Sequence, residues 1–228
     1  MDSRLLTLLQ LCDSNFPSGA FSHSFGLETY IQDGRVHNKA TFARWLQTYL
    51  QKQLVCTDGL VCRLCYEALE QNRIEDIWQL DQLVTVQNSA RESREASRRM
   101  GERMIRLGMD LFSIASLNEY EEKLRAKYCF GHPAIVFTII AYHLTITKQD
   151  VLLSFLYSSM ATLVQNGVRG IPLGQTDGQR LLLELQPFLL QAAKRIQTMD
   201  SADLGVVSPG LEISQMQHER LNVRLFMS

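Results

Sequence analysis

The chain has 228 residues, and 46% of them are hydrophobic, which is enough to bury a sizeable core in one large domain or two small ones. The formal net charge is −1, so no overall positive field draws the protein to nucleic acid. Only five prolines and thirteen glycines interrupt the chain, and their clustering between apolar segments favours long helices over many short strands.

The first twelve residues carry an apolar run that is broken by Thr7 and Gln10 and has no small-residue cleavage site. This segment therefore does not qualify as a secretory signal. The richest later run, 134–141, is far shorter than the roughly eighteen residues that cross a bilayer. We therefore expect a cytoplasmic protein that binds no membrane.

Apolar residues recur at helical spacing along most of the chain. The first clear stripe contains Phe42, Trp45, Leu46, Tyr49, Leu50 and Leu54. Asp58-Gly59 is expected to open a further helix over 60–69, and another begins at Ile74. The segment 88–109 predicts a long helix whose small residues allow a neighbouring helix to approach closely, and 118–127 predicts a short surface helix.

The second half of the chain continues this pattern. Segment 134–142 has the composition of a buried strand, but Pro133 at its start favours a buried central helix. Thr147 to Asp150 resembles a capping box before the apolar stripe that ends near Val164. Asn166-Gly167 predicts a helix stop, and 181–196 predicts the last long helix, with a kink at Pro187. A flexible break is expected at 205–210.

The five cysteines, Cys12, Cys56, Cys62, Cys65 and Cys129, form no disulfide framework. Cys62 and Cys65 make a single Cys-x-x-Cys, and no second pair completes a structural zinc site. Packing is the simpler interpretation of this pair, with metal or redox chemistry as the alternative.

Enzyme motifs are scarce in the sequence. The glycine-rich segment 166–180 lacks the Gly-Lys-Ser/Thr of a nucleotide P-loop, and no His-Glu-x-x-His is present. Ser22-His23-Ser24 places a serine beside a histidine, but adjacency does not give the geometry of a triad. A serine hydrolase that uses Ser22 and His23 is therefore the less supported alternative, and we expect no catalytic residues.

Four segments are more specific. Segment 13–28 is a helix–loop–helix joint that contains His23 and Glu28, and 91–99 is an arginine–glutamate helix with Arg91 and Arg94 on one side. Segment 166–180 has turn and cap residues that explain its shape, 176–179 among them as a capping box, but none of these roles uses Arg169. Segment 209–228 is an apolar chain end that either folds back on its own domain or docks on another protein.

In this order, the four segments resemble the UreF family of urease accessory proteins over nearly the whole chain. The resemblance implies an all-α fold of about ten helices, with residues 1–228 as a single domain, 208–228 as a docking tail, and a homodimer. It also implies a complex with the accessory protein UreD (also called UreH), the GTPase UreG and, through them, apo-urease. The protein would bind no cofactor tightly, because the complex handles nickel and the partner binds GTP.

Under this hypothesis the tail binds the UreD-type partner, whereas Glu28, Arg169 and the arginine–glutamate helix contact the GTPase or gate it. The candidate partner-binding residues are Glu28, Arg91, Arg94, Arg169, Gln175, Asp177, His218, Arg224, Leu225 and Phe226. No dense set of metal ligands is apparent, and His23 alone is more typical of a hydrogen-bonding residue than of a nickel ligand. A generic helical scaffold unrelated to nickel is the remaining alternative.

Overall fold

The computed structural model describes residues 3–206 and 208–228, and every regular element within them is helical. The α-helices are α1 (Ser3–Cys12), α2 (Leu27–Gln32), α3 (Lys39–Tyr49), α4 (Leu60–Glu70), α5 (Ile74–Gln87), α6 (Arg91–Leu111), α7 (Ala115–Arg125), α8 (Pro133–His143), α9 (Lys148–Gly170), α10 (Gln175–Thr198) and α11 (Pro209–Gln217). Short 3-10 turns η1 (Ala20–Ser22), η3 (Ser201–Asp203) and η4 (His218–Arg220) and a π-helical segment η2 (Leu50–Gly59) join them. The predicted all-α single domain is confirmed.

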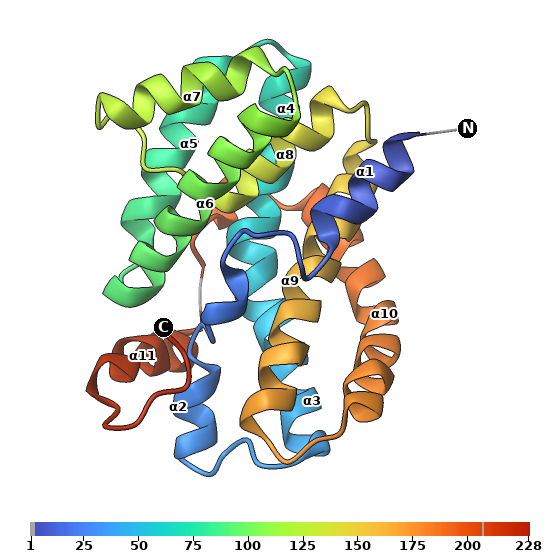
Figure 1. The fold of residues 1–228 in the computed structure, drawn as a ribbon, viewed down its shortest axis with the longest axis vertical. Coiled ribbons are helices and arrows are strands. Elements are labelled where there is room, and N and C mark those ends of the chain that lie inside the picture. Colours follow the sequence, from blue (N-terminus) through green and yellow to red (C-terminus); the bar gives the residue numbers. More distant parts are fainter. Residues whose placement is uncertain (1–2, 207) are drawn as a thin grey trace.

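The core is built on α8 and α9, which lie in the middle of the molecule (Figure 1). Residues Pro133 to Ala141 of α8 are all buried, with α4, α6, α7 and α9 packed around them. The helix prediction for this segment is therefore confirmed over its strand-like composition, because helices enclose it on every side. By length and composition α9 could span a bilayer, yet half of its most apolar window is buried inside the domain, as in the core helix of a soluble protein.

The start of α8 is fixed by a buried polar network. Asp81 is fully buried on α5 and accepts hydrogen bonds from the backbone N–H groups of Phe130 (2.6 Å) and Gly131 (3.1 Å). The Tyr120 hydroxyl donates to Asp81 (2.5 Å) and accepts from the His132 N–H (3.0 Å). The predicted close approach of a neighbouring helix to α6 also occurs, since a Cβ on Gly108 would lie 3.0 Å from the Cδ1 atom of Ile140 in α8.

The helix that was expected to open after Asp58-Gly59 is present as α4, but the glycine does not interrupt the helical chain before it. Gly59 has helical dihedral angles (φ −63°, ψ −45°), and the chain continues from α3 through the π-helical η2 into α4. The glycine serves packing instead, because a Cβ there would meet Ile196 of α10 at 2.6 Å.

The predicted stop at Asn166-Gly167 is also wrong, because α9 runs on to Gly170. Asn166 is fully buried and its side-chain amide donates to the backbone oxygen of His23 at 2.8 Å. Only 171–174 separates α9 from α10, and α10 begins after Gly174 with no side-chain cap, so the capping box predicted for 176–179 is absent. The cap at Thr147 is confirmed, since its side chain accepts a hydrogen bond from the Asp150 N–H. Pro187 lies inside the continuous helix α10, and Val207, within the predicted break at 205–210, lies outside the described residues.

Candidate docking site around the C-terminal segment

The C-terminal segment folds back onto the domain, and Glu28 is its main anchor. Glu28 is 5% exposed at the start of α2, directly after Phe25 and Gly26, whose positive φ angles (51° and 92°) make the turn into the helix. Its carboxylate accepts hydrogen bonds from the backbone N–H groups of Leu225 (2.5 Å) and Phe226 (3.1 Å). Because one buried carboxylate satisfies two backbone donors of the tail, it fixes the path of the chain there.

His218 joins the tail to two acidic side chains. The ring is fully buried, with Nε2 2.9 Å from Glu28 Oε2 and Nδ1 2.6 Å from Glu92 Oε2. The other oxygen of Glu92 accepts a hydrogen bond from Arg224 at 2.7 Å. Side chains from α2, α6, η4 and the final segment therefore meet in one polar cluster, which we call the tail clamp (Glu28, Glu92, His218 and Arg224).

Arg169, near the end of α9, also contacts the tail. Its guanidinium donates to the backbone oxygen of Phe21 at 3.2 Å and lies over two aromatic rings, 4.0 Å from the centroid of Phe21 and 5.1 Å from that of Phe226. Phe226 is 4% exposed, so the guanidinium of Arg169 stacks on an aromatic side chain that is packed against the domain.

The end of the segment pairs with the loop that precedes α2. The Ser24 N–H donates to the Ser228 oxygen (2.6 Å), and the Met227 N–H donates to the Ser22 oxygen (2.8 Å). The His23 ring contacts the Ser228 hydroxyl through Nδ1 (2.9 Å), and among the described residues it makes no hydrogen bond with the side chain of Ser22. The side-chain pairing on which a Ser22–His23 hydrolase depends is therefore not formed here.

Burial is the main cause that lowers the pKa of His23 to about 4, assisted by the positive charges of Arg99 and Arg103 and by His218. The imidazole of His23 is therefore neutral at physiological pH.

The same segment turns apolar side chains outward. The large hydrophobic residues of α11 and the tail that remain exposed are Ile213, Met216, Val223, Leu225 and Met227. Leu225 is 51% exposed and Val223 is 77% exposed, although their neighbour Phe226 is buried. A segment held by buried polar contacts thus leaves five large apolar side chains exposed, which together we call the tail surface.

The structure brings most of the predicted site residues together. Glu28, Arg169, His218, Arg224, Leu225 and Phe226 all lie in or against the tail. Arg91 reaches the same region through a bidentate contact with Glu219 (2.8 and 3.3 Å). Arg94 donates to the backbone oxygens of Asn88 and Ser89 before α6. Their roles as partner contacts stay predictions.

Two predicted residues lie apart from this cluster. Gln175 and Asp177 are in the first turn of α10, where Asp177 pairs with Arg180 at 3.3 Å. Conversely, the sequence interpretation missed Glu92, because its neighbours in the arginine–glutamate run made it look like one more surface charge. Only its contacts with His218 and Arg224, far along the chain, distinguish it.

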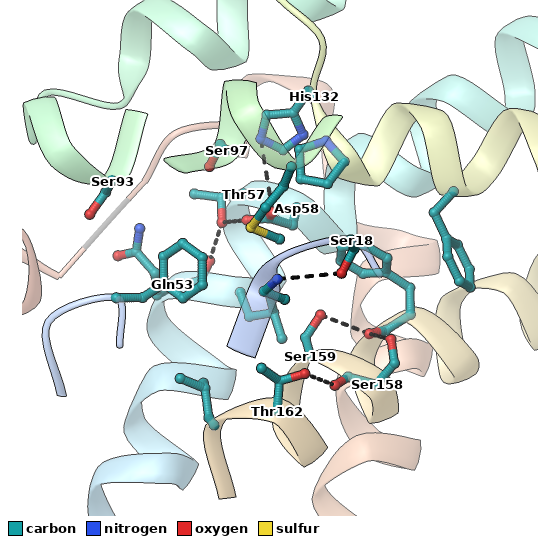
Figure 2. Close-up of a pocket in the computed structure, with 18 of the residues that line it drawn as sticks. Ser18, Gln53, Thr57, Asp58, Ser93, Ser97, His132, Ser158, Ser159 and Thr162 are labelled. Atoms are coloured by element: carbon teal, nitrogen blue, oxygen red, sulfur yellow. Dashed lines mark hydrogen bonds and ion pairs between the residues drawn. The ribbon is translucent and has the colours of Figure 1, made fainter. Parts of the chain in front are cut away.

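A partly open pocket of about 160 Å³ is lined by residues of α1, η2, α6, α8 and α9, among others. Figure 2 shows Thr57, Asp58 and His132 at one end of it and Ser158, Ser159 and Thr162 of α9 at the other. His132 Nε2 is 3.9 Å from Asp58, and among the described residues His132 Nδ1 and Gln53 Oε1 have no hydrogen-bond partner. Within residues 3–206 and 208–228, no group of three His, Cys, Asp or Glu side chains has an arrangement that could hold a metal ion.

The Cys-x-x-Cys pair is part of the core. Cys62 and Cys65 are fully buried on α4, with their sulfur atoms 3.7 Å and 4.0 Å from the carbonyl oxygens of Ala134 and Ile135. Burial raises the pKa of both thiols, which keeps them protonated and weakens them as metal ligands. The packing interpretation therefore fits their surroundings.

Comparison with known proteins gives a consistent result along the whole chain. Residues 36–186 match the model of the family described as UreF. The chain is 54% identical to the urease accessory protein UreF of Lachnoclostridium phytofermentans, with 100% of both chains covered. It is 53% identical to that of Bacillus sp. (strain TB-90), over 99% of this chain and 100% of the relative, and 50% identical to that of Geobacillus kaustophilus, over 100% and 99%.

Proposed function

The chain belongs to the UreF family of urease accessory proteins, and from this premise we propose that it is a non-enzymatic adaptor that supports GTP-dependent nickel incorporation into urease. In this proposal it works in the cytoplasm as a homodimer. It joins the accessory protein UreD (UreH) to the GTPase UreG on apo-urease. Because the sequence has no P-loop, the GTPase supplies the nucleotide site, and nickel is cargo of the whole complex.

The observation that carries the proposal is the contrast between the tail clamp and the tail surface. A docking segment that is already ordered loses little conformational entropy when a partner binds, so its exposed apolar side chains contribute more of their burial energy to affinity. The five exposed side chains of the tail surface thus suit a partner protein, which we take to be UreD.

An adaptor couples its partners only if it contacts two states of one of them differently. Glu28 of the tail clamp and Arg169 both contact Phe226, so a change at either contact acts on the same segment. We propose that occupancy of the tail by UreD and docking of the GTPase influence each other through this contact.

The test is co-purification with UreD and UreG in a urease-positive host that lacks the native gene. The variant Val223→Asp/Leu225→Asp is expected to lose UreD and leave urease inactive and free of nickel. The matched control Leu83→Asp/Val86→Asp places two aspartates on exposed positions of α5, outside the tail surface, and is expected to behave as wild type. Fully active, nickel-loaded urease in the absence of the gene would contradict the proposal, as would ester hydrolysis by the pure protein that Ser22→Ala abolishes.

A further inference from the structure

One exposed side of α6 carries three arginines that have almost no carboxylate partners in the protein. Arg99, Arg103 and Arg106 follow the spacing i, i+4 and i+7, which places them on one face of the helix, and all three are exposed. Arg99 has only a distant carboxylate neighbour, Glu95 at 3.8 Å. Among the described residues, Arg103 and Arg106 have no acidic group within 4 Å, and the Glu102–Arg106 pair that their spacing favours is not formed.

The turn η1 connects this face to Arg169. A Cβ on Gly19, just before η1, would lie 2.8 Å from a guanidinium nitrogen of Arg103, so the backbone of the turn packs directly on that side chain. At the other end of the same turn, Arg169 donates to the Phe21 oxygen and covers the Phe21 ring, which remains 49% exposed. Arg103 and Arg169 therefore border one short loop with an exposed aromatic side chain.

The chemistry of this surface favours a protein partner. Arginine forms bidentate pairs with carboxylates and stacks on aromatic rings, and arginine and aromatic side chains are enriched in the centres of protein interfaces. Glu95 and Asp110 lie near the two ends of the arginine row on α6, so the positive region is short and does not form the long basic track typical of nucleic-acid binding.

We propose that Arg99, Arg103, Arg106 and Arg169, with Phe21 beside them, form a docking surface for an acidic segment of the GTPase partner, an inference that rests on the proposed function. The acidic side chains pair with the arginines, and an apolar side chain of the same segment packs on Phe21. Because Arg169 also contacts Phe226, a partner that docks on this surface would affect the segment that carries the tail surface.

The experiment measures the affinity of purified UreG for the complex of this chain with UreD, between about 50 and about 200 mM salt. Arg103→Glu/Arg106→Glu is expected to weaken binding by roughly tenfold at the lower salt concentration and to flatten the salt dependence. The control Arg44→Glu/Lys52→Glu makes the same change of charge at exposed positions of α3 and η2 and is expected to bind as wild type. Unchanged melting temperatures would show that both variants fold.

The outcomes separate the two proposals. If wild type binds UreG and the Arg103→Glu/Arg106→Glu variant binds equally well, the docking surface is overturned and the adaptor role stands. If the wild-type complex does not bind UreG at all, both are overturned. If the variant loses affinity for a short RNA while its affinity for UreG is unchanged, the surface is a nucleic-acid site and this inference is wrong.

Discussion

Gly167 of α9 packs directly against the ring of Phe42 on α3, and a Cβ on Gly167 would lie 2.2 Å from the Cζ atom of that ring. The two helices approach this closely because residue 167 has no side chain. Phe42 is fully buried, so its ring has no free space into which it can move.

Gly167→Ala is therefore expected to lower the free energy of unfolding by about 1–3 kcal/mol, despite the better helix propensity of alanine. Thermal unfolding followed by circular dichroism measures the change. The control Gly174→Ala adds the same methyl group where no atom lies within 4 Å and φ is −79°, and it should leave the melting temperature nearly unchanged. A Gly167→Ala protein as stable as wild type would contradict the packing argument, whereas partial recovery in Gly167→Ala/Phe42→Leu would support it.

Glu28→Ala is expected to release the tail from the domain. The substitution leaves the Leu225 and Phe226 N–H groups and the Nε2 atom of His218 without their acceptor, at a cost of about 1–3 kcal/mol. Limited trypsin digestion should then cut after Arg220 and Arg224 much faster than in wild type. Glu219→Gln removes the exposed contact with Arg91 and serves as the control, with little change in digestion expected. Equal digestion of Glu28→Ala and wild type would show that Glu28 does not anchor the tail.

The stability of the protein should fall in mild acid partly because of His23. The pKa of His23 is lowered to about 4 in the folded protein, against an ordinary value near 6.5, so the unfolded chain takes up the proton first as the pH falls. This contribution to stability is complete above about pH 6.5 and is lost as the pH falls towards about 4. The free energy of unfolding that is lost by about pH 5 is about 2 kcal/mol. Urea unfolding of wild type and His23→Gln at both ends of this range isolates it. An identical loss of stability in the two proteins would contradict the assignment.

The two thiols of the Cys-x-x-Cys pair should resist alkylation while the protein is folded. Thiolates are the reactive form, and burial raises the pKa of both Cys62 and Cys65. Iodoacetamide at about pH 8, read out by peptide mass spectrometry, should leave them unmodified until urea is added. Cys12 offers an internal comparison, because it is only partly buried and its pKa is raised to about 11. Rapid native labelling of Cys62 would show that the α4–α8 contact opens readily.

Helix positions were largely predictable from the sequence, because apolar spacing is a local signal. The stripe that begins at Phe42, the long helix of the arginine–glutamate run and the cap at Thr147 all follow from neighbouring residues. Even α8, with its strand-like composition, was predictable from Pro133 at its first position.

The wrong predictions arose where a residue type that usually ends a helix is present because of a contact with a distant part of the chain. Gly59 and Gly167 look like helix ends in sequence, yet each lies inside a helix and makes room for a side chain from another one. The tail clamp was hidden for the same reason, since Glu28, Glu92 and His218 are separated by many residues and nothing near any of them indicates the others. Conversely, Gln175 and Asp177 are close to Arg169 in the sequence, but in the structure they lie apart from the site that contains Arg169.

The π-helical stretch Leu50–Gly59 sets the rotational phase between α3 and α4. Each residue of an α-helix turns the chain by about 100°, whereas a π turn spreads more residues over one revolution. Rewinding this stretch to ordinary α geometry would rotate α4 about its own axis and carry Cys62 and Cys65 away from α8. A descendant that gained or lost one amino acid here would therefore have to rebuild the neighbouring half of its core, so we expect chain length in this stretch to be under strong purifying selection.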